Sequence, residues 1–149
     1  MFWIITVAVA ALDQISKLIV ARSMELESTV ELIPGVFDLT YIRNDGAAWG
    51  ILSGRQTLLI VTTAIVLAAI CVYVLKYSSR LNRAELVSLA LIAGGGIGNL
   101  ISRAFEHGVV DFLNIHIIPI FNVADIGVTV GCILLMISLF RADNGKTDI

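Results

Sequence analysis

The sequence contains few charged residues and few prolines. Of its 149 residues only 15% are Asp, Glu, Lys or Arg, whereas 58% are hydrophobic, and the mean hydropathy is +0.93. A soluble globular domain carries considerably more charge, so this class is excluded. With only two prolines and few low-complexity stretches, the chain also lacks the composition of a disordered protein.

Basic residues and cysteines are also scarce. Ten Lys and Arg stand against 12 Asp and Glu, for a net charge of -2, so no basic patch is available to bind nucleic acid. The two cysteines, Cys71 and Cys132, lie in apolar runs, where a thiol behaves as a small hydrophobe. Neither a disulfide framework nor a metal cluster is indicated. We expect no metal, no cofactor and no nucleic-acid partner.

The hydrophobic residues are concentrated in long runs. A bilayer core of about 30 Å requires roughly 20 apolar residues in a helix. Four runs approach this length, at residues 2–20, 57–75, 86–101 and 120–140. We therefore predict an all-α membrane protein in which residues 1–149 form a single integral membrane domain with four transmembrane helices. Because no Lys or Arg precedes the first run, we expect a retained helix and not a cleavable signal peptide.

The Lys and Arg residues of the short loops predict the orientation of these helices. Lys76, Arg80 and Arg83 follow the second run, and Arg141 follows the fourth. Loops on the cytoplasmic side of a membrane are enriched in Lys and Arg. Both termini are therefore expected in the cytoplasm.

Two longer connections, residues 22–56 and 103–119, are then predicted to lie outside the cytoplasm. The first contains short β-rich pieces within residues 29–52, interrupted by the turn signals Pro34-Gly35 and Asn44-Asp45-Gly46. We expect it to form a small extracytoplasmic β-cradle. The second connection is amphipathic.

Several polar residues interrupt the apolar runs. They are Asp13 and Lys17 in the first run, Asn99 and Arg103 in and just after the third, and Asn122 and Asp125 in the fourth. At about 1.5 Å per residue, Asp13 lies near the middle of its span and the others lie toward the outer side. An ionisable group within a span is a functional candidate, because stranding it in hydrocarbon costs at least a few kcal/mol. Since the cytoplasmic halves contain no charged residue, a site open to the outside is favoured over an ion path.

Residues four positions apart share a helix face. Asp13 and Lys17 are so spaced and predict an ion pair, and Asn99 shares a face with Arg103 in the same way. Two interpretations of the ion pair stay open. It is either a structural pair whose lysine extends toward the interface, or a polar group that faces a substrate.

Glycines four positions apart predict close helix packing. Gly94 with Gly98 on the third run, and Gly127 with Gly131 on the fourth, form two such pairs of small residues. We expect them to let the third and fourth helices approach closely. This packing would bring Asn99 of the third helix toward the polar start of the fourth.

Asp111 and Asp125 are 14 residues apart, and both are predicted at the outer interface, with Pro119 between them. Two adjacent carboxylates in a partly desolvated site cannot both stay ionised, and a shared proton makes one an acid and the other a base. Such a pair can activate water against an amide bond. The Gly-x-Ser-x-Gly and His-Glu-x-x-His motifs of other hydrolases are absent from the sequence.

Five short blocks along the chain form a recognisable series. They are Asp13-Gln14-Ile15-Ser16-Lys17, Arg43-Asn44-Asp45-Gly46-Ala47-Ala48-Trp49, Gly98-Asn99-Leu100-Ile101-Ser102-Arg103, Val109-Val110-Asp111-Phe112 and Phe121-Asn122-Val123-Ala124-Asp125. In this order, and over nearly the whole chain, the blocks resemble those of the bacterial lipoprotein signal peptidase family, also called signal peptidase II.

The resemblance implies an intramembrane aspartic endopeptidase. Enzymes of this family cleave the signal peptide from diacylglyceryl-modified prolipoproteins, just before the lipidated cysteine, and Asp111 and Asp125 match their catalytic pair. The resemblance also implies a multi-pass protein of the bacterial cytoplasmic membrane with its active site near the outer face. It implies an extracytoplasmic amphipathic helix, which we assign to residues 103–119. We expect a monomer in contact with membrane lipid.

Other residues match family positions that bind substrate or support the catalytic pair. They are Asp13, Lys17, Asn44, Gly46, Asn99, Arg103, Asn122 and Ala124. The sequence departs from the family at two positions, because the family usually has Asp where Ser102 stands and a small polar residue where Ile126 stands. Neither position carries the expected acid or base.

Two other functions compete with this interpretation. A small ion-coupled membrane carrier would use Asp13 and Asp125 as relay groups, but the apolar cytoplasmic halves of the spans count against it. A membrane assembly factor would use the glycine-rich helices to bind partner helices. That function leaves Asp111 and Asp125 unexplained.

Overall fold

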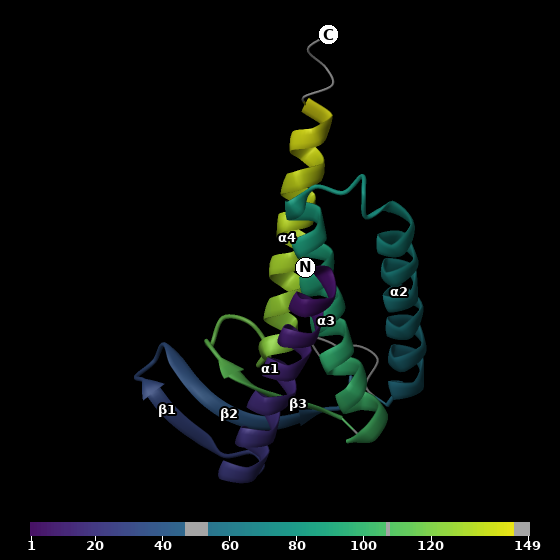
Figure 1. Ribbon diagram of the computed structural model, residues 1–149. Helices are drawn as coiled ribbons and strands as arrows, with labels where there is room; N and C mark the ends of the chain where they lie inside the picture. Colours follow the sequence, from purple (N-terminus) through teal and green to yellow (C-terminus); the bar gives the residue numbers. More distant parts are fainter. Residues whose placement is uncertain (47–53, 107, 145–149) are drawn as a thin grey trace.

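The computed structural model describes residues 1–46, 54–106 and 108–144, and within them it contains four helices and one three-stranded sheet (Figure 1). The elements are α1 (Phe2–Ser23), β1 (Thr29–Ile33), β2 (Phe37–Asn44), α2 (Gln56–Tyr77), α3 (Arg83–Phe105), β3 (Val109–Asn114) and α4 (Val123–Asn144). Each helix contains a stretch that is long and apolar enough to cross a membrane. The predicted class is confirmed, since the protein is a mostly helical membrane protein with a small sheet.

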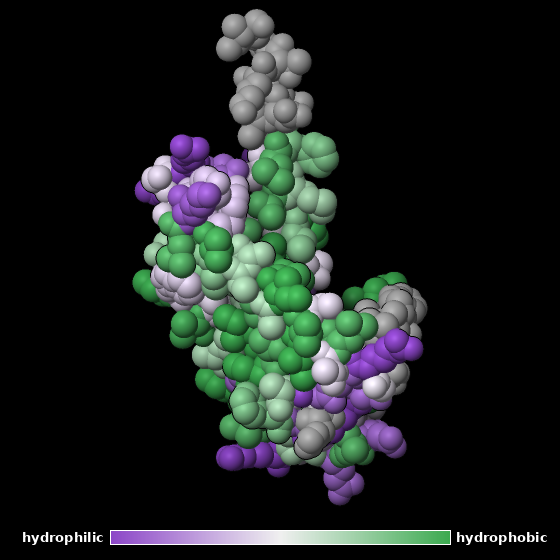
Figure 2. Space-filling view, turned by 90° about the vertical axis from the view of Figure 1, so that its right-hand side faces the viewer, coloured by the Kyte–Doolittle hydropathy of each residue, from purple (hydrophilic) through white to green (hydrophobic). Residues whose placement is uncertain are grey.

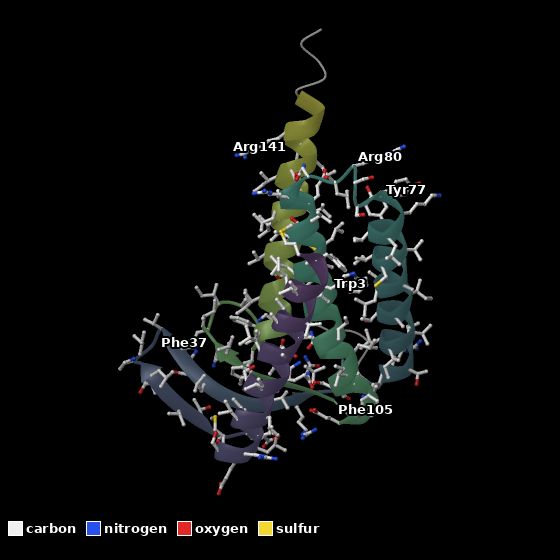
Figure 3. The ribbon with its side chains drawn as sticks, viewed as in Figure 1. Trp3, Phe37, Tyr77, Arg80, Phe105 and Arg141 are labelled. Atoms are coloured by element: carbon white, nitrogen blue, oxygen red, sulfur yellow. The ribbon has the colours of Figure 1, made fainter. Side chains whose placement is uncertain are left out.

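The surface pattern agrees with this class. Figure 2 shows a broad hydrophobic surface across the middle of the molecule, with hydrophilic residues gathered near both ends. One end carries the sheet. Figure 3 shows Arg80 and Arg141 at the opposite end, whereas Phe37 of β2 and Phe105 of α3 lie at the sheet end. The basic residues that predicted a cytoplasmic side are therefore far from the sheet.

A capping asparagine decides where α3 begins. Asn82 precedes α3, and its side-chain oxygen accepts the Glu85 N–H at 2.9 Å while the Glu85 carboxylate accepts the Asn82 N–H at 2.9 Å. This reciprocal arrangement starts α3 at Arg83, several residues before the apolar run. Hydrophobicity alone therefore places the helix ends only approximately.

The third helix lies at the centre of the bundle, because it packs against each of the other helices. Glycines allow its closest approach to α4. A Cβ on Gly95 would collide with the Ala124 carbonyl oxygen, and one on Gly131 would lie 2.7 Å from the Ser88 carbonyl oxygen. The predicted close packing of these two helices is confirmed.

Two of the glycines face a different helix from the one expected. A Cβ on Gly94 would lie 2.8 Å from the Thr6 carbonyl oxygen, and one on Gly98 would collide with the Asp13 carboxylate. Both neighbours belong to α1. The prediction that Gly94 and Gly98 pack against the fourth helix was therefore wrong, because a central helix needs small residues on more than one face and spacing does not say which neighbour each face meets.

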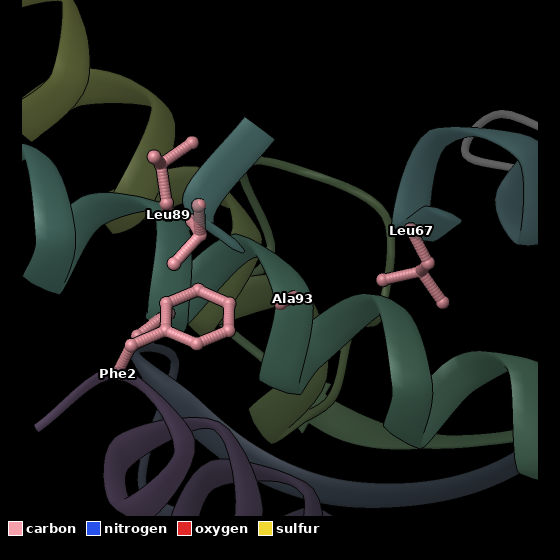
Figure 4. Close-up of a cluster of buried hydrophobic side chains, with 6 residues drawn as sticks. Phe2, Leu67, Leu89 and Ala93 are labelled. Atoms are coloured by element: carbon pink, nitrogen blue, oxygen red, sulfur yellow. The ribbon is translucent and has the colours of Figure 1, made fainter. Parts of the chain in front are cut away.

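The second helix stands to one side of the other three described helices (Figure 1) and packs mainly against α3. A buried cluster that includes Leu67 of α2, Leu89 and Ala93 of α3 and Phe2 of α1 contributes to this contact (Figure 4). Most other side chains of α2 are exposed in the isolated protein, as expected for a helix that faces lipid.

The sheet has the order β1-β2-β3, and both strand pairs are antiparallel. Its first two strands come from residues 22–56, which supports the expected β-cradle, although the predicted β-rich pieces at 47–52 lie outside the described residues. The amphipathic helix assigned to residues 103–119 was wrong. Beyond the end of α3 the described part of this segment is a strand and loops, because Val109, Val110 and Phe112 are buried when β3 pairs with β2.

Candidate active site

Asp111 lies on β3, where its carboxylate contacts Asn44 of β2. Across this antiparallel pair Asp111 is opposite Ile42, and Asn44 is opposite Val109. Residues two positions apart point to the same face of a sheet. The Asn44 Nδ2 donates a hydrogen bond of 2.8 Å to Asp111 Oδ2.

Asp125 lies in the first turn of α4 and forms a reciprocal cap with Asn122. The Asn122 backbone N–H donates to Asp125 Oδ2 at 3.1 Å, and the Asp125 backbone N–H donates to Asn122 Oδ1 at 3.0 Å. This is the geometry of a capping box, with Asp in the position where Glu is usual. The helix therefore begins at Val123, and its first turn fixes the Asp125 carboxylate.

Asn122 also connects the two carboxylates. Its Nδ2 donates to Asp111 Oδ1 at 2.6 Å and to Asn99 Oδ1 at 3.2 Å, and its side chain is fully buried. Asn99 in turn donates from Nδ2 to Asp125 Oδ1 at 2.8 Å. Asp111 and Asp125, from β3 and α4, are thus joined through two asparagine side chains. The expected approach of Asn99 to Asp125 is confirmed.

The predicted ion pair between Asp13 and Lys17 is present inside the protein. Lys17 Nζ lies 2.7 Å from Asp13 Oδ2, and the two side chains are 2% and 0% exposed. Lys17 Nζ also donates to Asn99 Oδ1 at 2.8 Å, and Asp13 Oδ1 accepts the Ala124 backbone N–H at 2.9 Å. The pair therefore supports Asn99 and the first turn of α4, and its lysine does not extend to the surface.

Arg103 and Gly46 lie at the side of the site formed by α3 and β2. The Arg103 Nη2 donates to the Gly46 carbonyl oxygen at 3.1 Å, and the Arg103 carbonyl oxygen accepts Gln56 Nε2 at 2.6 Å. Gly46 also donates its N–H to Asn44 Oδ1 at 2.9 Å. Asn44, which contacts Asp111, is thus oriented by the same turn that contacts the arginine.

A cavity of about 740 Å³ opens beside these groups. Its polar wall is formed by Asn44, Asn99, Arg103, Asp111, Asn122 and Asp125. The rest is largely apolar and includes residues of α2, α3 and α4 and residues 118–121. A polar group held at one side of an apolar cavity is the usual form of a site that orients an apolar ligand.

Burial changes the acidity of Asp111, which is 3% exposed. Its pKa is raised from 3.8 to about 6, mainly by loss of water and also by the nearby charge of Asp125. The hydrogen bonds from Asn44 and Asn122 and the charge of Lys17 oppose this rise. A carboxyl with a pKa near 6 can both take up and release a proton close to neutral pH.

The predicted site residues therefore form one connected group. Besides the cavity residues, it includes Asp13, Lys17, Gly46 and Ala124. Of the described residues, no three His, Cys, Asp or Glu side chains are grouped so as to hold a metal ion.

Sequence reasoning missed several residues of the site. Gln14 donates from Nε2 to Asp13 Oδ2 at 3.1 Å and to the Gly98 carbonyl oxygen at 3.0 Å, so it joins α1 to α3. Its place inside an apolar run was a signal. Thr62 and Thr63 of α2 also line the cavity, but nothing in their uncharged run distinguished them.

Ser102 and Ile126, the two positions that depart from the family, have different surroundings. Ser102 is fully buried, and its Oγ accepts Gln14 Nε2 at 3.4 Å, outside the set of residues that line the cavity. Ile126 is 42% exposed and lines the cavity next to Asp125.

Comparisons with known proteins agree over nearly the whole chain. The family model described as Signal peptidase (SPase) II matches residues 5–141. A lipoprotein signal peptidase of Listeria monocytogenes is 42% identical over 98% of this chain and 96% of its own, and that of Staphylococcus aureus is 38% identical over 97% and 91%. A solved bacterial membrane enzyme, determined by the in meso method, has a TM-score of 0.91 and 38% identity, covering 99% of this chain and 92% of that chain.

Proposed function

The chain belongs to the signal peptidase II family and is therefore a peptidase of lipoprotein signal peptides, and we propose that it cleaves them with Asp111 and Asp125 as an acid and base pair. The observation that carries this proposal is the connection of both carboxylates through Asn122 and Asn99 at one wall of the cavity. Since β3 and α4 are held together there and both carboxylates line the same cavity, we propose that one water molecule contacts both of them.

The proposed reaction is hydrolysis by an activated water. The ionised carboxylate accepts a proton from the water, whose oxygen attacks the scissile carbonyl carbon, while the protonated carboxyl donates to the carbonyl oxygen. Collapse of the tetrahedral intermediate then breaks the C–N bond: the leaving amine takes the proton that the base received from water, and one hydroxyl of the intermediate returns its proton to the other carboxylate, so the pair again holds one proton. The pKa of about 6 at Asp111 supports this exchange, because a carboxyl of that acidity takes up and releases a proton near neutral pH.

We propose that the remaining polar residues orient the pair and the substrate. Asn44 and Asn122 fix the two oxygens of Asp111, and Asn99 fixes Asp125. The Asp13 and Lys17 pair holds Asn99 and the Ala124 N–H, which supports the same geometry from α1. These groups have little freedom because they are buried and bonded on several sides, and fixed groups lower the cost of reaching the transition state.

The cavity supports a substrate that is itself apolar. Its walls carry Val66 and Leu67 of α2 and Val128 and Val130 of α4, so a lipid-modified peptide can stay out of water while its scissile bond reaches the aspartates. We propose that cleavage occurs just before a diacylglyceryl-modified cysteine. We propose that the protein acts as a monomer, because the residues proposed to bind and cleave the substrate all come from this chain.

The proposed orientation puts the sheet and the two aspartates on the outer side of the bacterial cytoplasmic membrane and both termini in the cytoplasm. Lys76, Arg80 and Arg141, which favour the cytoplasmic side, support it. Arg80 and Arg141 lie at the end of the molecule opposite the sheet (Figure 3). A carrier that uses Asp13 as a relay is less well supported, because the side chain of Asp13 is fully buried and paired with Lys17.

The test is cleavage by the purified full-length protein in detergent or lipid. A diacylglyceryl-modified precursor is incubated with it beside the same precursor without lipid, and the products are identified by mass spectrometry. We expect cleavage of the lipidated precursor just before its cysteine and much slower cleavage of the unlipidated form. Equal cleavage of both precursors, cleavage at another bond, or no cleavage of the lipidated form contradicts the proposal.

A further inference from the structure

The loop of residues 115–120, between β3 and α4, forms part of the cavity wall. Its ends are closed by backbone hydrogen bonds, from Leu113 N–H to the Phe121 carbonyl oxygen at 2.8 Å and from Phe121 N–H to the Leu113 carbonyl oxygen at 3.1 Å. Ile118, Pro119 and Ile120 line the same cavity as the two aspartates. The position of this loop therefore sets the shape of the space beside the reacting groups.

His116 connects the loop to the sheet. Its Nε2 lies 2.9 Å from Asp38 Oδ2, and Asp38 on β2 is only 7% exposed. The His116 backbone N–H donates to Asn114 Oδ1 at 3.0 Å. This close contact between the His116 imidazole and the Asp38 carboxylate ties residues 115–120 to another strand, β2.

The backbone at His116 is held in an unfavourable conformation. Its φ is +60°, in the left-handed region that residues other than glycine adopt at a cost. Such a conformation persists when surrounding contacts hold it, and the Asp38 contact is one of them. The burial of Asp38 strengthens its contact with His116, because a carboxylate removed from water is stabilised by a nearby N–H donor.

We propose that Asp38 and His116 are positioning residues that hold the loop of residues 115–120 as an apolar wall against the lipid-modified substrate. This inference rests on the proposed function of the cavity. The pair does not touch the reacting groups, and Asp111 and Asp125 are held by other contacts. Release of the loop therefore weakens substrate binding and leaves the chemistry of the aspartates unchanged.

The test compares steady-state cleavage of the lipidated precursor by the wild type, His116→Ala, His116→Gln and Asp38→Ala. A single polar contact of this kind contributes about 1 kcal/mol, so KM is expected to rise about threefold to tenfold in the two alanine variants, with kcat within about twofold of the wild type. His116→Gln keeps a side-chain N–H donor and the same backbone strain, so it is expected to keep KM close to the wild-type value.

Thr29→Ala is the matched control. It removes a side-chain hydrogen bond of 3.1 Å to Thr40 between β1 and β2 on the same sheet, but leaves the contacts of Asn114 with Thr40 and with the His116 N–H in place, and is expected to leave KM unchanged. An unchanged KM in either His116→Ala or Asp38→Ala, failure of His116→Gln to restore it, or an equal rise in Thr29→Ala overturns the inference. A wild type that does not cleave the lipidated precursor instead refutes the proposed function, so the two failures are distinguishable.

Discussion

The Asn122 side chain donates from Nδ2 to Asp111 Oδ1 across 2.6 Å, so the residue that caps α4 also holds the carboxylate on β3. Its side-chain oxygen accepts the Asp125 N–H at 3.0 Å. One asparagine thus sets the relative position of two acidic residues from different elements. The start of the fourth helix and the arrangement of the proposed catalytic pair depend on the same side chain.

Replacement of Asn122 by alanine is expected to reduce both stability and activity. Loss of the helix cap costs about 1 kcal/mol. The freed carboxylates lose their fixed separation, and a displacement of about 1 Å can lower kcat about a hundredfold. Cleavage of the lipidated precursor and the thermal midpoint are measured on the same preparation.

Asn82→Ala is the control for this prediction, because Asn82 caps α3 through the Glu85 N–H. It is expected to lower the thermal midpoint by a similar amount without the loss of kcat. The interpretation of Asn122 is wrong if both variants lose activity equally.

Asp111→Asn and Asp125→Asn are each expected to abolish cleavage while the protein stays folded. Asparagine has nearly the size of aspartate but cannot exchange a proton in this way, so the water loses its base or the leaving group its acid. Turnover of the lipidated precursor is the measurement, with Glu25→Gln on the exposed segment between α1 and β1 as the control expected to stay active. Substantial turnover by either Asn variant would remove that aspartate from the mechanism.

Asp111 is expected to make the stability of the fold depend on pH. Because its pKa rises from 3.8 to about 6 on folding, the folded protein binds this proton more tightly than the unfolded chain does. Its contribution is therefore present below pH 3.8 and is lost as the pH rises through about 6. The rise corresponds to at most about 3 kcal/mol.

The measurement is the difference in thermal stability between the wild type and Asp111→Asn at pH values between 4 and 7. The pH-dependent contributions of the other titrating groups are the same in both proteins and cancel in this difference. The wild type is therefore expected to lose stability relative to the variant as the pH rises. A difference that does not change with pH would show that burial does not raise the pKa of Asp111.

Removal of one partner of the buried ion pair is expected to be more harmful than removal of both charges. Lys17→Met leaves the Asp13 carboxylate buried without its cation, which costs about 3 to 5 kcal/mol in comparable cases. In Asp13→Asn combined with Lys17→Met, the side-chain oxygen still accepts the Ala124 N–H but no charge is buried. Thermal unfolding should place the double variant closer to the wild type, and a double variant no more stable than Lys17→Met contradicts this account.

The helices and most of the site were predictable from sequence because their signals are local. A run of about 20 apolar residues is incompatible with water, and a carboxylate within such a run is costly unless it has a partner. The spacing of four residues was enough to predict the pair of Asp13 and Lys17. The same spacing put Asn99 on one face of the third helix with Arg103.

The strand β3 could not be predicted in this way. Val109 and Val110 favour a strand, but a strand of six residues is stable only beside a partner, and β2 lies more than 60 residues earlier in the chain. The amphipathic character of residues 103–119 was compatible with a helix until that partner was known. The same holds for Gly94 and Gly98, whose neighbours on α1 are set by the packing of the bundle.

The sequence by itself determined that this chain crosses a membrane, and which acidic and amide residues are too costly there to lack a role. Only the tertiary structure decided how these residues meet, with Asn122 between Asp111 and Asp125 and with Lys17 beside Asn99. The physical reason is the distance along the chain over which each interaction acts. Hydrophobicity and helix spacing act over neighbouring residues, whereas the contact of Asn44 with Asp111 joins residues 67 positions apart and exists only after the strands and helices have packed.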